Sequence, residues 1–174
     1  MVDAWRTSIS SLLEDEQSKA NPLDHRLVHF LLEEYVAELE ALVAEQGLSQ
    51  RITFTGFRRD LARLFEVLDV VCVPSRNEAF GLTVIEAMAA GKAVIGSRSG
   101  AIPELIDAHS GRLADPESAS EWAAAMLELA QDGELRRRLG EEARRRVKQH
   151  FLLSQHVQGL TQVYDDVLAG RPAV

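Results

Sequence analysis

Short apolar segments alternate with helical segments between residues 60 and 114, and this alternation limits the fold more than any other feature. The run Asp69 to Pro74 is continuously apolar, which predicts a strand buried on both faces. Short strands separated by helices favour right-handed crossovers and a parallel sheet, so we predict an α/β fold. The expected order is helix 60–68, strand 69–74, helix 82–90, strand 93–96, helix 102–106 and strand 111–113.

Helices are expected on both sides of this region. Residues 1–20 form a polar, weakly helical arm, and Asn21-Pro22 begins a helix whose 3.6-residue apolar period continues to Gly47. A β-rich run follows at 52–55. The last third predicts three more helices, with Asp115 capping the first of them; they span 116–131, 134–150 and 152–169.

Composition excludes several classes of protein. The net charge of −8 argues against a general nucleic-acid binder. The single cysteine, Cys72, permits no internal disulfide and is predicted to be a buried apolar filler. Neither a transmembrane segment nor a signal peptide is evident, so we expect a cytoplasmic protein.

The segment Ser75 to Ile95, SRNEAFGLTVIEAMAAGKAVI, carries the strongest indication of chemistry. It leaves a predicted strand, turns at Gly81 and begins a helix at Leu82, an arrangement that directs unpaired amides toward an anion such as phosphate. Glu78 and Glu86 flank this turn, and carboxylates accept hydrogen bonds from sugar and ribose hydroxyls. The alternative is that Glu78 is merely solvated and Glu86 is an ordinary helix charge. Residues 51–100, with seven bases and five acids, are the only third with a positive balance.

The stretch NEAFGLTVIEAMAAGKAVI resembles the signature of family-four retaining glycosyltransferases, in which seven residues separate two glutamates around a Phe-Gly-Leu turn. The resemblance extends to EQGLSQRITFTGF, SRSGAIPELI and GRLADP, and covers roughly residues 38–169. It implies a Rossmann-like, parallel-sheet C-terminal lobe of the GT-B architecture within residues 21–174. In that family this lobe binds the nucleoside-diphosphate-sugar donor, here expected to be a UDP- or GDP-sugar, without an obligatory metal.

The resemblance also assigns expected roles to individual residues. Glu78 would be the catalytic residue beside the anomeric carbon, and Glu86 would take the ribose hydroxyls. The amides of Leu82 and Thr83 would cap the diphosphate. The sugar pocket would be shaped by three further residues, with an alanine where the family usually has glycine; these are Ala79, Phe80 and Gly81.

The sequence departs from the family in two places. No segment before Asn21 carries the basic pair that neutralises the donor diphosphate, and residues 26–32, where a strand is expected, have helical periodicity. The resemblance covers only the donor-binding lobe, so we expect the family's acceptor-binding lobe to lie outside these 174 residues. We therefore expect either a donor-binding lobe that works with a separate N-terminal-lobe subunit, a non-catalytic nucleotide-sugar-binding module, or a fold remnant that packs against a partner. The last helix, 152–169, has more apolar residues than one face buries and suggests a homo-oligomer.

Two further patterns have ordinary interpretations. The basic run in 134–149 is expected to be a solvated helix face with local ion pairs, since glutamates are interleaved with its arginines. His25 and His29 lie four residues apart, but no third metal ligand is evident, so no metal site is predicted.

Overall fold

The computed structural model describes residues 25–171, with side chains from Tyr35 onward, and its chain divides into two compact units between Phe57 and Arg58. In the first unit, α2 (His25–Glu45) ends where Gly47 adopts a φ of 67°. The predicted helix is therefore confirmed from His25 onward, and residues 26–32 are helix rather than strand; its predicted start at Asn21-Pro22 lies outside the described residues. The arm at 1–20 lies outside the described residues.

The β-rich run 52–55 does not form a strand, so that prediction is wrong. Both large apolar side chains of this run are exposed, Ile52 by 41% and Phe54 by 39%. An extended segment becomes a strand only when a neighbour supplies backbone hydrogen-bond partners. No strand pairs with this run within residues 25–171.

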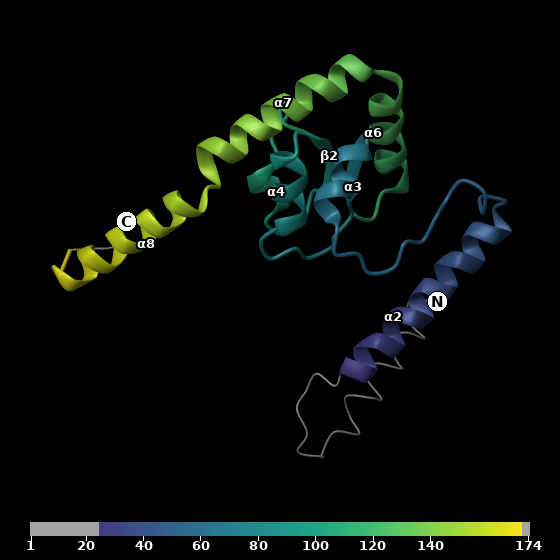
Figure 1. Ribbon diagram of the computed structural model, residues 1–174, viewed down its shortest axis with the longest axis horizontal. Helices are drawn as coiled ribbons and strands as arrows, with labels where there is room; N and C mark the ends of the chain where they lie inside the picture. The colour runs from purple at the N-terminus through teal and green to yellow at the C-terminus, as the bar shows by residue number, and fades with distance from the viewer. Residues whose placement is uncertain (1–24, 172–174) are drawn as a thin grey trace. The chain divides into compact units, whose positions relative to one another are not determined.

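The second unit contains a three-stranded parallel sheet in the order β1-β2-β3 (Figure 1). Its strands are β1 (Val70–Val73), β2 (Ala93–Ser97) and β3 (Arg112–Ala114). Val71 pairs with Val94, and Ile95 pairs with Arg112. All five residues of the central strand β2 are buried, as expected for a parallel strand covered on both faces. The α/β prediction is confirmed.

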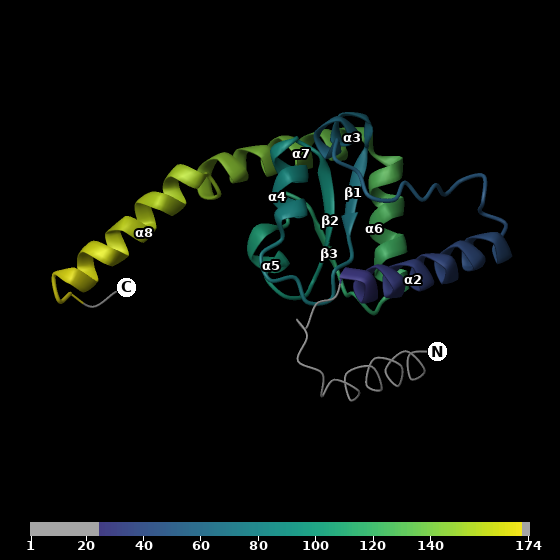
Figure 2. The same cartoon turned by 60° about the horizontal axis from the view of Figure 1, so that its bottom comes forward.

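Helices cover both faces of the sheet. Figure 2 shows α4 and α5 on one side and α6 on the other. Core side chains of α3, α4 and α5 pack with Val94, whereas those of α6 pack with Ala93 and Ile95. Helix α7 contributes to both layers, through Val147 to the first and Leu139 to the second. The bounds are α3 (Leu61–Val67), α4 (Leu82–Ala89), α5 (Ile102–Leu105), α6 (Ala119–Gln131) and α7 (Gly133–His150).

Strand β1 forms one end of the sheet order and is buried on one face only. Val71 and Val73 belong to the core, but Cys72 is exposed, which corrects the prediction of a buried filler. Cys72 lies in a groove of about 370 Å³ between β1 and α6. Partial desolvation of the Cys72 thiol by the surrounding residues still raises its pKa.

The basic run on α7 forms local ion pairs, as predicted, but it also joins the elements of the unit. Arg137 pairs with Glu134 and Glu141 on the exposed surface. By contrast, Arg146 donates from Nε to the Leu105 carbonyl at 2.7 Å and from Nη1 to Asp107 at 2.9 Å. This arginine therefore ties the end of α5 to α7.

Asp107 joins the same network from the loop after α5. Its Oδ1 accepts hydrogen bonds from the Ser110 hydroxyl and amide, both at 2.9 Å, and from the His109 amide at 3.0 Å. Partial burial alone raises the pKa of this carboxyl, but these donors and the charge of Arg146 outweigh that effect and lower it. The network holds the α5 loop in one conformation beside the sheet.

The helix cap predicted at Asp115 is formed by another residue. Ser118, not Asp115, caps α6 by accepting from the Glu121 amide at 3.3 Å. Asp115 instead binds the Glu117 amide in the preceding turn at 2.8 Å. The last helix, α8 (Leu153–Leu168), has no buried residue, so the expected exposed apolar stripe is confirmed.

Candidate functional site

Glu78, in the loop before α4, forms hydrogen bonds to backbone amides of the same loop. Glu78 Oε1 accepts a hydrogen bond from the Gly81 amide at 3.0 Å and a longer one from the Phe80 amide at 3.4 Å. Gly81 has a φ of 87°, which residues with a Cβ rarely adopt, and a Cβ there would require the end of the Leu105 side chain, 2.6 Å away, to move. Glu78 is thereby held at the positive end of α4, where its charge is favourable.

One face of α4 is free for a ligand. Leu82, Thr83 and Glu86 are exposed, while Val84 and Ala87 on the opposite face are buried. The first amide of this helix to bond within the chain is that of Ile85, which donates to the Gly81 carbonyl at 3.1 Å. The amides of Leu82 and Thr83 find no acceptor among residues 25–171. An anion at the start of α4 would meet two unpaired donors, about one helical turn before Glu86.

The loop after β2, residues 98–101, contacts the backbone of Glu78. The Ala101 amide donates to the Glu78 carbonyl at 2.9 Å, and Gly100 packs directly on the Glu78 backbone. Ser99 donates from its hydroxyl to the Arg76 carbonyl. The Arg76 side chain instead pairs with Glu117 at 2.9 Å on the exposed surface. The loop after β2 thus fixes the position of Glu78.

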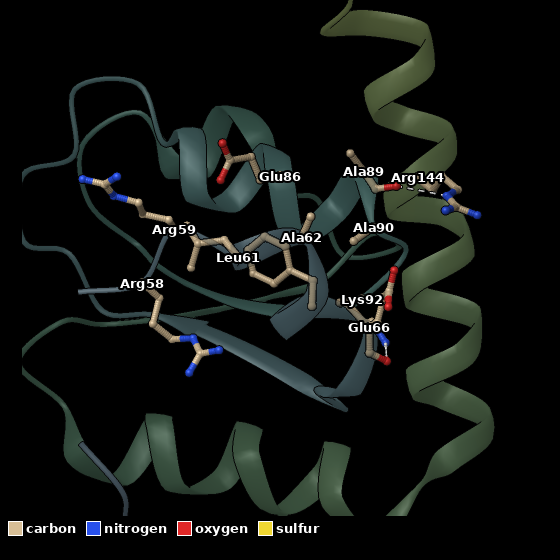
Figure 3. A pocket seen from close by; sticks show the side chains of 11 residues that line it. Arg58, Arg59, Leu61, Ala62, Glu66, Glu86, Ala89, Ala90, Lys92 and Arg144 are labelled. Atoms are coloured by element: carbon tan, nitrogen blue, oxygen red, sulfur yellow. Dashed lines mark hydrogen bonds between the residues drawn. The ribbon is translucent and has the colours of Figure 1, made fainter. Parts of the chain in front are cut away.

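A cleft of about 800 Å³ opens beside Glu86 (Figure 3). Its walls come from α3 and the residues before it, from α4 and the turn after it, and from the second half of α7; the lining residues are Arg58, Arg59, Leu61, Ala62, Phe65, Glu66, Glu86, Ala89, Ala90, Lys92 and Arg144. Of the predicted site residues only Glu86 lines this cleft, whereas Glu78 lies at the start of α4. Glu78 therefore lies at the N-terminal end of α4, whereas Glu86 lies within α4 and lines the cleft.

The four cations of the cleft were not singled out from the sequence, although residues 51–100 have the only positive balance. Three of them bind groups of the chain itself. Arg58 makes two bonds to Asp60, at 2.9 and 2.5 Å, and these lower the pKa of that carboxyl. Lys92 donates to the Glu66 carbonyl at 3.1 Å. Arg144 donates to the Ala89 carbonyl at 3.0 Å.

Comparison with known proteins now decides the family. The profile of the glycosyl transferases group 1 family matches residues 23–146. The chain belongs to this family. It is 34% identical over 140 residues to D-inositol 3-phosphate glycosyltransferase of Corynebacterium kroppenstedtii, covering 79% of this chain and 31% of that protein. It is 35% identical over 134 residues to MMP α-(1→4)-mannosyltransferase of Mycolicibacterium hassiacum, covering 75% and 33%. The chain spans about a third of the length of these relatives.

Solved structures agree with this family assignment. Anabaena HepE, solved in complex with UDP, superposes with a TM-score of 0.74 at 28% identity, over 77% of this chain and 37% of that one. The C-terminal domain of a glycosyl transferase group 1 family protein, LpcC of Francisella tularensis, gives a TM-score of 0.62 at 31% identity over 69% of this chain and 64% of that one. The predicted GT-B C-terminal lobe is confirmed. No helix within residues 25–171 is both long and apolar enough to cross a membrane.

Proposed function

We propose that this chain binds a nucleoside-diphosphate sugar and forms the donor-binding lobe of a retaining glycosyltransferase. One observation carries the proposal. The amides of Leu82 and Thr83 at the start of α4 have no acceptor among residues 25–171, and the exposed Glu86 on the same helix lines a cleft of about 800 Å³. Backbone amides at a helix start suit phosphate, and a carboxylate suits vicinal hydroxyls. The UDP complex of Anabaena HepE supports a nucleotide as the ligand.

In this proposal the donor lies along α4. The diphosphate accepts hydrogen bonds from the Leu82 and Thr83 amides, which also stabilise the negative charge that develops as the sugar departs. The ribose hydroxyls donate to Glu86. Ala79, Phe80 and Gly81 shape the space for the sugar, where Phe80 is 56% exposed.

Glu78 is the proposed catalytic residue. It already uses Oε1 to accept the Gly81 amide, so the diphosphate takes the two later amides without displacing it. The hydrogen bond orients the carboxylate, and its second oxygen remains available to stabilise positive charge on the sugar ring. Transfer with retention needs an acceptor hydroxyl held near the anomeric carbon and water kept away. We propose that a second lobe, on another part of the protein or on a partner subunit, supplies both.

Binding without transfer is the second candidate. It is favoured by exposure of the site, since Phe80, Leu82 and Glu86 are all open to solvent in this unit. An exposed donor site holds a nucleotide but does not exclude water from it. This candidate predicts nucleotide affinity together with no glycosyl transfer under any condition.

Calorimetry with UDP, GDP and their sugars tests the proposal. Glu86→Ala removes the acceptor of the ribose hydroxyls and is expected to weaken binding about tenfold or more, since hydrogen bonds to charged groups contribute about 1.5–3 kcal/mol. Glu66→Ala is the matched control, because Glu66 lines the same cleft on α3 instead of α4. Absence of binding by the unchanged chain, or equal losses in both variants, refutes the proposal.

A second variant separates the two candidates. Glu78→Gln keeps an oxygen for the Gly81 amide and so preserves the loop, but it removes the charge. Retained UDP affinity with loss of glycosyl transfer supports a catalytic role for Glu78. No transfer by the unchanged chain, alone or with an acceptor-lobe protein, supports a binding module.

A further inference from the structure

Arg146 and the short helix α5 connect α7 to the loop that carries Glu78. The Arg146 guanidinium donates to the carbonyls of the last two residues of α5, at 2.9 Å for Glu104 and 2.7 Å for Leu105. It also donates to the Asp107 carboxylate at 2.9 Å. The last carbonyls of a helix have no partner within it, and the helix dipole favours a cation beside them. Arg146 therefore holds the C-terminal end of α5.

The N-terminal end of α5 contacts the loop before α4. Directly before α5, the Ala101 amide donates to the Glu78 carbonyl at 2.9 Å. Within α5, the side chains of Ile102 and Leu105 are buried, and their atoms come within 3.8 and 2.6 Å of the position that a Cβ of Gly81 would take. A displacement of α5 therefore moves both Glu78 and the residue that precedes the first turn of α4.

Helix α5 has only four residues, so its internal hydrogen bonds are too few to fix where it lies. Its position is set by its contacts, which are Arg146 at one end and the loop with Glu78 and Gly81 at the other. We propose that Arg146 is a positioning residue, which acts through α5 to hold Glu78 and the start of α4 in the arrangement that the donor requires. The consequence for a ligand rests on the proposed function.

Arg112 is a matched control for Arg146. Its side chain is 27% exposed, against 25% for Arg146, and it also binds backbone carbonyls and a carboxylate. These partners are the carbonyls of Ala108 and Gly111, at 3.2 and 3.0 Å, and the Glu128 carboxylate at 2.8 Å. They lie outside α5 and outside the loop before α4. Loss of the Arg112 side chain should therefore destabilise the unit by a comparable amount without acting on that loop.

Amide hydrogen exchange measures the connection without any ligand. Two amides report on the loop, since the Gly81 amide donates to Glu78 Oε1 at 3.0 Å and the Ala101 amide donates to the Glu78 carbonyl. Arg146→Ala should accelerate the exchange of both amides about tenfold or more, because the loop opens more often when α5 is held at one end only.

A reference amide separates positioning from a general loss of stability. The Leu135 amide, which is hydrogen-bonded at the start of α7, serves this purpose. In Arg146→Ala the two loop amides should be accelerated more than the reference, whereas in Arg112→Ala all three should change by the same factor. If Arg146→Ala does not fold, Arg146→Lys and Arg112→Lys give the same comparison, since lysine keeps the charge but loses the planar fork of donors.

The affinity for UDP connects this positioning to the donor. Arg146→Ala is expected to raise the Kd of UDP about three- to tenfold, because the first two amides of α4 move with Gly81. Arg112→Ala should leave the Kd within about twofold of that of the unchanged chain. Arg146→Lys should give an intermediate Kd, since its ammonium group still donates to a carbonyl of α5.

The outcomes separate this inference from the proposed function. Loop amides that exchange no faster than the reference amide in Arg146→Ala overturn the role of Arg146 and leave the donor site standing. Faster exchange with an unchanged Kd of UDP also overturns it, since the loop then moves without consequence for the donor. Failure of the unchanged chain to bind UDP and GDP overturns the proposed function, and the exchange rates then still support or overturn the connection through α5.

Discussion

Replacing Gly100 by alanine tests how the two loops of the site support each other. Gly100 has a φ of +59°, and a Cβ there would lie 2.3 Å from the Glu78 carbonyl oxygen and 2.8 Å from the Glu78 amide nitrogen. Both contacts are with backbone, so no flexible side chain can move to relieve them. The left-handed conformation costs about 1–2 kcal/mol for a residue with a Cβ. Forcing the backbones apart adds about 1–3 kcal/mol, as overpacking does in cores.

Gly91→Ala separates these two contributions. Gly91 also has a positive φ, +74°, but the nearest atom to its Cβ would be Arg144 Nε at 3.7 Å, an ordinary contact. Its cost should therefore be only the conformational one. Chemical denaturation should give Gly100→Ala a free energy of unfolding about 1–3 kcal/mol lower than that of Gly91→Ala. The Gly100 variant should also lose UDP affinity, since Glu78 moves with the loop.

The result that refutes this reasoning is equal stability of the two variants, within about 0.5 kcal/mol, together with unchanged UDP affinity in both. Equal stability with a loss of affinity in the Gly100 variant alone has a different meaning. It shows that the loop moves away without unfolding the lobe, so that the clash is absorbed locally at Glu78.

Three other predictions concern side chains outside the proposed site. The pKa of Asp107 is lowered in the folded state, so its contribution to stability is present above about pH 4 and is lost as the pH falls through the lowered value; the stability gap between the unchanged chain and Asp107→Asn should shrink in acid, and a constant gap contradicts this. The thiol of Cys72 should be alkylated without unfolding because it is exposed, but more slowly than a free thiol at pH 8 because its pKa is raised; protection from reagent until denaturant is added contradicts the exposed edge. Leu139→Ala, at a side chain with 2% exposure, should cost about 2–5 kcal/mol in denaturation, whereas Leu160→Ala on α8, with 44% exposure, should cost under about 0.5 kcal/mol; equal losses contradict the exposed position of α8.

Much of the fold was predictable because its signals are local. The apolar run at β2 and the helical periods around it predict a parallel α/β unit, and the structure has one. Glu78 and Glu86 were found in the same way, by a motif contained within a single loop and helix. Their proposed chemical roles remain predictions, since they depend on a ligand.

Other features depend on neighbours that are distant in the sequence. Residues 52–55 have strand composition, but without a pairing partner they do not form a strand. Cys72 alternates with buried valines in an apolar run, yet its face of β1 borders an open groove beside α6, so Cys72 stays exposed. Composition describes what a segment prefers, whereas pairing and burial are set by what lies beside it.

The sequence by itself determined the order of helices and strands from residue 60 onward, the turn before α4 and the glutamates that flank it, because each of these follows from residues close together in the chain. Only the tertiary structure decided which cations are available to a ligand. Seven basic residues between 51 and 100 look alike in the sequence, but packing gives Arg58, Arg76 and Lys92 partners within the unit, whereas Arg59 has none among residues 25–171. The partners of these side chains are set by tertiary packing, so they cannot be inferred from the local sequence around each basic residue.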